Sequence, residues 1–220
     1  MDGGGGSTEG AIDLKPMRLA CTAVIFAATL FAPTIFAQKD KPVEMPKAPG
    51  LYAIFDTTFG PIVAKLYEDK APNTVKNFVD LAEGRKATLN KAGQMEARPY
   101  YNGLTFHRVV KEFMIQAGDV KGTGSTPCGI PNLRDEMDKS LHFDHEGKLA
   151  MANTGRPNSA SCQFFITVGP ADYLDGHFTM FGEVVSGQDV AERISRVPTM
   201  TTEKPMLPVL IKTVTIKRVE

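Results

Sequence analysis

The sequence predicts a mainly β protein whose strands form an antiparallel barrel. Many short runs of Val, Ile, Phe and Tyr are separated by turns that contain glycine or proline. Only two segments have apolar residues at helical spacing, one after Pro72 and one near 187–197. The segment 209–219 alternates Val and Ile with Lys and Thr, which is typical of a strand with one face in water. These patterns alone do not give the number of strands.

The composition argues against several classes of function. The chain has 220 residues, 25 of them basic and 25 acidic, which fits one domain with extensions. The balanced charge and the lack of a basic cluster argue against a nucleic-acid partner. The cysteines are Cys21, Cys128 and Cys162, and they have no CxxC spacing. We therefore expect neither a zinc site nor a thioredoxin-like motif.

A secretory signal peptide is expected near the start of the chain. Residues 1–16 are rich in glycine, and Arg18 then precedes an uncharged run at 19–37. A short basic start, an apolar stretch and a small final residue are the features of such a signal. We expect cleavage after Ala37 and export, with the periplasm as the expected compartment. The alternative is an uncleaved membrane anchor, because 19–37 is nearly long enough to span a bilayer.

Three segments are therefore expected. They are an N-terminal extension and signal peptide at 1–37 with its signal core at 17–37, a linker at 38–50, and a globular domain at 51–220. The linker is rich in Pro and Lys, so it is expected to be extended and solvated.

The domain begins with a predicted hairpin and a predicted helix. Residues 51–57 and 61–67 are strand-like, with Gly60 at the turn between them. Pro72 suits the first turn of a helix, and Gly84 suits the position after its end. The apolar face of this helix is formed by Val75, Phe78, Val79 and Ala82.

Two polar stretches flank 106–116, which itself is predicted to form two short apolar strand segments. Residues 85–99 are predicted to be a surface loop that could include some helix around 91–96. Residues 118–131 are rich in Gly and Pro and predict a tight loop. Within it, Gly122–Ser125 is similar to a phosphate-binding loop, but no Lys follows and no helix begins there.

The second half of the domain contains a histidine pair and two strands. His142 and His145 could suggest a metal site, but two histidines three apart in a polar loop are usually solvated. Residues 149–151 and 162–168 are strand-like. Strand alternation places Gln163, Phe165 and Thr167 on one face, and Phe164 and Ile166 on the other.

Five segments together resemble the cyclophilin family of peptidyl-prolyl isomerases. They are Phe106–Gln116, Met151–Asn153, Ser161–Ile166, Tyr173–Gly176 and Phe181–Gly182, and the resemblance covers roughly 51–219. It implies a closed eight-stranded antiparallel β-barrel capped by two α-helices. It also implies isomerisation of Xaa-Pro bonds without a cofactor, with proline-containing peptides as partners. Together with the signal peptide, it predicts a monomer that assists the folding of exported proteins.

The same resemblance assigns roles to individual residues. It implies that Arg108 is catalytic, and that Phe113, Met114, Gln116, Ala152, Asn153, Gln163, Phe165, Tyr173, Leu174 and Phe178 bind substrate. Phe113, Met114, Phe165 and Leu174 match the proline pocket, and Gln116 matches the Gln that supports the Arg. Simple alternation would put Phe113 and Met114 on opposite faces, so the strand is expected to bend between Lys111 and Phe113.

Two positions depart from the best-known eukaryotic pattern. Tyr173 stands where those members have Trp, and Phe178 stands where they have His. The departures put peptide preference and drug binding in doubt, but the arginine chemistry requires neither residue.

The resemblance also bears on the cysteines and on the competing functions. It puts Cys162 on a strand, facing away from Gln163, and Cys128 in a loop, so no required disulfide between them is expected.

One alternative function is a non-catalytic peptide-binding module or holdase, which would have no need of Arg108. Another is a cysteine hydrolase built on Cys162, but the sequence around it has no nucleophile signature.

Overall fold

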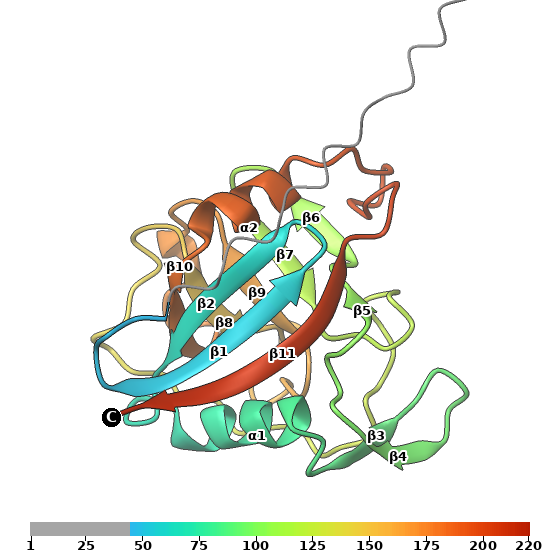
Figure 1. Ribbon diagram of the computed structural model, residues 1–220, viewed down its shortest axis with the longest axis horizontal. Coiled ribbons are helices and arrows are strands. Elements are labelled where there is room, and N and C mark those ends of the chain that lie inside the picture. The colour runs from blue at the N-terminus through green and yellow to red at the C-terminus, as the bar shows by residue number, and fades with distance from the viewer. Residues whose placement is uncertain (1–44) are drawn as a thin grey trace, which may run out of the picture. The chain divides into compact units, whose positions relative to one another are not determined.

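The computed structural model describes residues 45–220 (Figure 1). The predicted signal peptide and its cleavage site lie outside the described residues. Within the described part of the chain, no helix is both long and apolar enough to cross a membrane.

One antiparallel sheet of nine strands forms most of the fold. Its strands are β1 (Gly50–Thr57), β2 (Gly60–Leu66), β5 (Leu104–Thr105), β6 (Arg108–Val110), β7 (Met114–Ala117), β8 (Lys148–Met151), β9 (Phe164–Thr167), β10 (Met180–Ser186) and β11 (Leu210–Val219). Their order across the sheet is β5-β11-β1-β2-β10-β8-β9-β7-β6. The predicted hairpin at the start of the domain is confirmed, because β1 and β2 pair across Thr57 and Gly60.

The two edge strands of this sheet are neighbours in the chain. Only Phe106 and His107 separate β5 from β6, so the sheet must curl until its edges approach each other. The sequence-based expectation was eight strands. This sheet has nine, because one stretch of chain contributes two separate short strands, β5 and β6, at its opposite edges.

The two α-helices lie at opposite ends of the curled sheet (Figure 1). They are α1 (Pro72–Ala82) and α2 (Gln188–Ser195), both close to their predicted positions. No side chain caps α1 locally. Instead, the distant Glu136 carboxylate accepts hydrogen bonds from the backbone N–H groups of Asn73 and Thr74. This carboxylate satisfies first-turn donors that would otherwise have no partner.

The strands separate two apolar clusters by alternation of their side chains. Phe164 and Ile166 join the larger core, where Phe55, Phe78, Tyr101 and Phe181 lie close together. Phe165 joins a smaller cluster with Met114 and Leu174. The predicted division of β9 into two faces is therefore confirmed. The face that carries Phe165 is also apolar, because Phe165 packs in the smaller cluster.

The helix considered for 91–96 is absent. The structure instead has a small two-stranded sheet of β3 (Ala87–Leu89) and β4 (Met95–Ala97). The Asn90 side chain accepts hydrogen bonds from the backbone N–H groups of Ala92 and Gln94, and Gly93 has φ 81°. This local turn reverses the chain and competes successfully with a helix.

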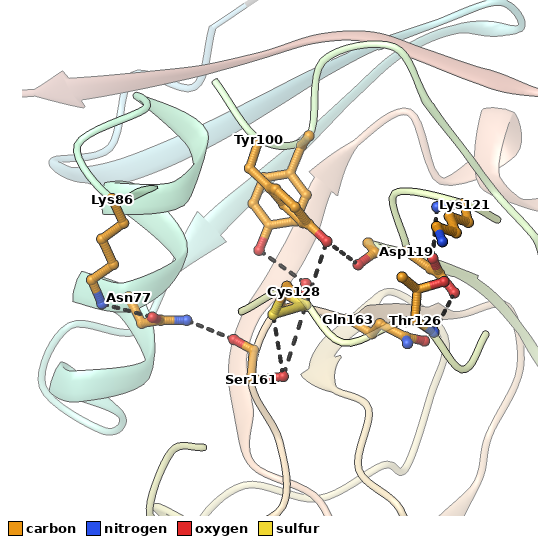
Figure 2. The surroundings of a disulfide bond; sticks show 12 residues. Asn77, Lys86, Tyr100, Asp119, Lys121, Thr126, Cys128, Ser161 and Gln163 are labelled. Atoms are coloured by element: carbon orange, nitrogen blue, oxygen red, sulfur yellow. Dashed lines mark hydrogen bonds between the residues drawn. A yellow bond between two sulfur atoms is a disulfide. The ribbon is translucent and has the colours of Figure 1, made fainter. Parts of the chain in front are cut away.

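The cysteine prediction is wrong, because Cys128 and Cys162 form a disulfide (Figure 2). The Gly/Pro-rich loop folds back onto the start of β9, where Tyr100 donates from its hydroxyl to the Gly118 carbonyl. Gly118 has φ 95°, and a Cβ there would lie 2.5 Å from the Cys162 carbonyl oxygen. Glycine thus allows a backbone contact that brings the loop, and with it Cys128, against the strand.

Candidate active site

The site is organised by one row of residues that crosses five strands. Arg108 on β6 pairs with Gln116 on β7, which pairs with Phe165 on β9. Phe165 pairs with Ala150 on β8, and Ala150 pairs with Met180 on β10. Directly opposed residues of antiparallel strands point to the same face of a sheet. The sheet register therefore places the Arg108 guanidinium and an apolar surface on one face.

An apolar cluster lies along this row, at residues that the family resemblance assigned to the proline pocket, and it is called the slot below. Met114, Phe165 and Leu174 are buried together in the smaller cluster, and Phe113 and Phe178 pack against it half-buried. The Phe178 ring meets Phe165 edge-on, with ring centroids 5.4 Å apart.

The predicted bend between Lys111 and Phe113 is present as a tight turn between β6 and β7. Glu112 has φ 62°, and the Phe113 N–H donates to the Val110 carbonyl. The turn removes Phe113 from the strand alternation. Phe113 and Met114 can therefore contact the same cluster.

Amides form the polar wall beside this slot. The Gln116 side-chain amide donates to the Gln163 side chain at 2.9 Å, and the Gln163 amide donates to the Gly124 carbonyl at 3.0 Å. The Ala152 N–H donates to the Gln163 carbonyl, which ties the chain after β8 to β9. The Asn153 amide donates to the His177 carbonyl. Gln116 on β7, Gln163 just before β9 and Ala152 just after β8 are thus linked by hydrogen bonds.

Arg108 is partly open to solvent and is held by a distant acid. Its side chain is 42% exposed, and its Nε donates to the Glu203 carboxylate at 2.6 Å. The neighbouring His107 ring is buried, and this burial lowers the pKa of the imidazole below its usual value. His107 is therefore neutral at physiological pH, and Arg108 supplies the positive charge at this position of the row.

The Gly/Pro-rich loop is organised by one carboxylate. Burial raises the pKa of Asp119, but backbone N–H groups of Thr126 and Lys121 and nearby threonine hydroxyls outweigh that effect and lower the pKa to about 2. The Asp119 carboxylate also accepts from the Thr123 N–H. Its hydrogen bonds fix the turn that presents the Gly124 carbonyl to Gln163.

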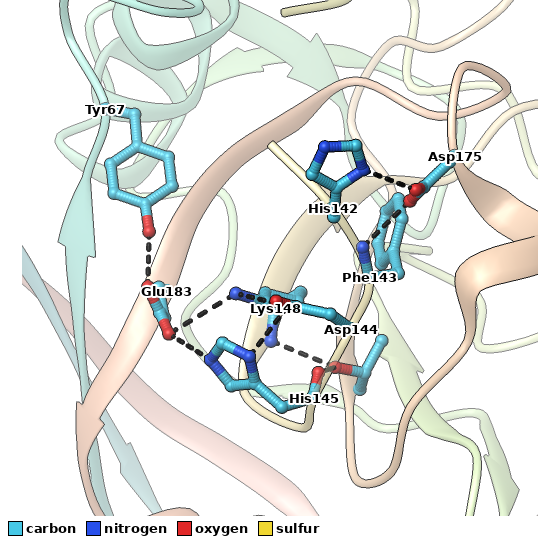
Figure 3. Close-up of polar contacts among 9 residues, drawn as sticks. Tyr67, His142, Phe143, Asp144, His145, Lys148, Asp175 and Glu183 are labelled. Atoms are coloured by element: carbon cyan, nitrogen blue, oxygen red, sulfur yellow. Dashed lines mark hydrogen bonds and ion pairs between the residues drawn. The ribbon is translucent and has the colours of Figure 1, made fainter. Parts of the chain in front are cut away.

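A cavity of about 340 Å³ lies next to the slot, beyond Phe178 and Met180. Its polar rim contains His142, whose Nδ1 lies 2.7 Å from the Asp175 carboxylate (Figure 3). The Asp175 hydrogen bond raises the pKa of His142.

The second histidine of the pair has a different partner. His145 lies against Glu183, 2.7 Å from its carboxylate, and Glu183 also accepts from Tyr67 (Figure 3). The two histidines thus face different carboxylates. Among residues 45–220, no group of three or more His, Cys, Asp or Glu side chains is arranged to hold a metal.

Nearly all of the residues predicted for the site lie on or beside this face. Tyr173 is the most open of them, 68% exposed, with its ring 5.8 Å from that of Phe113. The sequence reasoning missed Phe143, which stacks on Phe165 at 6.1 Å. It also missed Glu203, which lies 95 residues after its partner Arg108. No local pattern marks either contact.

Comparison with protein families gives one family over most of the domain. Residues 52–216 match the model of the cyclophilin type peptidyl-prolyl cis-trans isomerases. The chain is 44% identical over 168 residues to a probable peptidyl-prolyl cis-trans isomerase A of Mycobacterium bovis, covering 74% of this chain and 91% of that protein. It is 39% identical over 167 residues to the human peptidyl-prolyl cis-trans isomerase-like 1, covering 75% of this chain and 90% of that protein.

Solved structures agree with the sequence comparison. A cyclophilin type peptidyl-prolyl cis-trans isomerase of Cryptosporidium parvum superposes with a TM-score of 0.65 at 28% identity, covering 76% of this chain and 96% of that one. The structure determined in the presence of the dipeptide Ala-Pro gives a TM-score of 0.64 at 28% identity, covering 76% and 98% of the two chains. The curled antiparallel sheet, its two helices and these matches show that the chain belongs to the cyclophilin family and is a peptidyl-prolyl cis-trans isomerase.

Proposed function

We propose that Arg108 is the group that lowers the barrier to Xaa-Pro rotation. That barrier is roughly 18–20 kcal/mol because rotation breaks amide resonance. At the twisted state the prolyl nitrogen regains a lone pair, and a donor aimed at it binds that state better than either planar state. A rate gain of about 10⁵-fold needs only about 7 kcal/mol. One fixed cation beside an apolar slot is sufficient for this chemistry.

The observation that supports this proposal is the row of residues across the sheet. It sets Arg108 and Phe165 on either side of Gln116, all three on one face. A proline ring in the slot would lie on Phe165, Met114 and Leu174, with Phe113 at its side, and its nitrogen would face the guanidinium. We assign the flanking peptide to Gln116, Gln163, Ala152 and Asn153, with Tyr173 and Phe178 at the two outer walls.

Loss of turnover with retained peptide affinity in Arg108→Ala tests this assignment. A non-catalytic peptide binder does not accelerate Xaa-Pro isomerisation. In such a protein, Arg108→Ala would therefore leave the isomerisation rate unchanged.

The physiological role that we propose is the folding of exported proteins, with unfolded exported chains as partners of a monomeric enzyme. The support is the signal-like pattern at 17–37 followed by a Pro/Lys-rich linker. The disulfide is further support, because such bonds persist in oxidising compartments such as the periplasm.

Protein isolated from the native host should begin near Gln38. Intact-mass measurement of the mature chain tests this directly, and the control is the same gene expressed without residues 1–37. A mass that retains residues 19–37 would instead support the uncleaved membrane anchor.

Cyclosporin inhibition is expected to be weak. Tyr173 stands where the family's best-known members have Trp, and it lacks the indole N–H donor and the larger flat wall. The loss of one hydrogen bond and some apolar contact is expected to cost about 1–3 kcal/mol, roughly ten- to a hundredfold in affinity. Tyr173 is 68% exposed, so Tyr173→Trp can be accommodated without repacking.

The inhibition constants of the wild type and Tyr173→Trp test this expectation. The Trp variant should bind cyclosporin more tightly, and turnover of an Xaa-Pro peptide by both proteins is measured alongside to confirm that each is active. Wild-type inhibition as tight as that of Trp-containing members would refute the expectation.

A further inference from the structure

The segment between α2 and β11 contacts β6 at the residue that carries the guanidinium. Figure 1 shows this segment passing beside β6. It forms a tight hairpin, in which Thr199 and Pro205 form a β-bridge and the Glu203 N–H donates to the Met200 carbonyl. Glu203 lies at the tip of this hairpin with φ 61°, in the left-handed region that a residue with a side chain rarely adopts.

Glu203 holds β6 at two consecutive residues. Its backbone carbonyl accepts from the Val109 N–H at 2.8 Å, and its carboxylate accepts from Arg108 Nε at 2.6 Å. β6 is an edge strand of the sheet, so the Val109 N–H has no neighbouring strand on that side. A second tie fixes the hairpin, because Lys204 Nζ donates to the Gly122 carbonyl. These contacts therefore fix the backbone of Glu203 beside β6, which keeps its carboxylate within reach of Arg108.

The geometry at Nε has a specific consequence for the guanidinium. An Arg side chain has several rotatable bonds, and the 42% exposure of Arg108 shows that packing does not fix it. A charge-assisted bond at Nε fixes the guanidinium plane and leaves the four terminal N–H donors unused by that bond. A carboxylate on the terminal nitrogens would instead have occupied the donors that face a substrate.

We propose that Glu203 is a positioning residue for the isomerase reaction, which orients the Arg108 guanidinium toward the prolyl nitrogen. The proposal rests on the catalytic role proposed for Arg108. A carboxylate also weakens the positive field of its partner. Glu203 is 45% exposed, so solvent screens that opposing effect, and orientation outweighs it.

Glu203→Ala is expected to lower kcat about three- to tenfold with little change in peptide affinity, because a misdirected donor loses transition-state stabilisation first. Glu203→Gln should recover much of the loss, since its amide oxygen can still accept from Nε. Alanine and glutamine are as constrained as glutamate at a positive φ, so backbone strain changes little among the three. Glu68→Ala is the matched control, because it breaks the exposed Arg218–Glu68 pair with the same change in charge.

A double-mutant cycle separates this proposal from the one on which it rests. In an Arg108→Ala background, Glu203→Ala should have no further effect on kcat, because the positioned group is gone. The Arg108 Nε–H resonance in NMR spectra should exchange slowly with water in the wild type and in Glu203→Gln, and rapidly in Glu203→Ala.

Three outcomes would overturn the inference. They are an unchanged or raised kcat in a folded Glu203→Ala protein, a loss that appears in peptide affinity alone, and a loss that persists in full without Arg108. Normal turnover by Arg108→Ala would instead refute the catalytic assignment of Arg108. The Glu203 variants would then no longer test a positioning role, because there would be no catalytic group to position.

Discussion

Replacing Arg108 with alanine is expected to lower kcat/KM for an Xaa-Pro peptide about 10²–10³-fold, the equivalent of 3–4 kcal/mol for a preorganised donor in a partly dry site. The fold should remain intact, because the Arg108 side chain is 42% exposed and its partner Glu203 is 45% exposed. Glu203 can be solvated when its partner is removed. A protease-coupled assay gives the rate, and the thermal unfolding midpoint checks the fold.

Phe113→Ala is the informative contrast to Arg108→Ala. The Phe113 ring lines the slot and packs against the smaller apolar cluster, so its removal weakens the planar and the twisted states together. We expect it to act mainly through substrate affinity. Arg218→Ala, which removes an exposed arginine that pairs with Glu68, should leave both constants unchanged. Near-normal catalysis by a folded Arg108→Ala protein would contradict the mechanism.

Reduction of the Cys128–Cys162 disulfide is expected to lower the free energy of unfolding by about 2–4 kcal/mol. The bond joins residues 34 apart, so it restricts a sizeable loop of the unfolded chain. Both cysteines are buried, and the bond joins the loop organised by Asp119 to the start of β9. Denaturant unfolding of the wild type with and without reductant measures the effect, and the melting temperature should fall by about 4–16 °C.

The double variant Cys128→Ala, Cys162→Ala is the control for reductant effects. It should be destabilised whether or not reductant is present, and reductant should not change its unfolding curve. Equal stability of the oxidised and reduced wild type would show that the bond has no structural importance, as the sequence had suggested.

Local patterns were sufficient for the elements that form the frame of the site. Alternation assigned Phe164 and Phe165 to opposite faces, and Pro72 and Gly84 bounded the first helix. These predictions depend on periodicity and on backbone preferences of single residues, which the sequence shows directly. The residues proposed for catalysis and binding came from family resemblance, and the sheet register explains why such distant segments meet.

What the sequence did not predict depends on contacts between distant parts of the chain. The Asn90 turn competes with a helix through two side-chain hydrogen bonds, and its outcome is not evident from composition. The disulfide depends on the path of a loop that Gly118 allows to press against Cys162. The contact of Glu203 with Arg108 spans 95 residues and depends on the docking of the hairpin between α2 and β11 against β6.

The most direct test of the central claim is NMR exchange spectroscopy on an Xaa-Pro peptide saturated with enzyme, together with its dissociation constant. It separates the rate of isomerisation on the enzyme from binding. The account predicts that Arg108→Ala slows the on-enzyme exchange by about 10²–10³-fold. The dissociation constant should change by no more than about threefold, because the guanidinium acts on the twisted state. Unchanged on-enzyme exchange, or a loss of affinity that accounts for the whole effect, would contradict it.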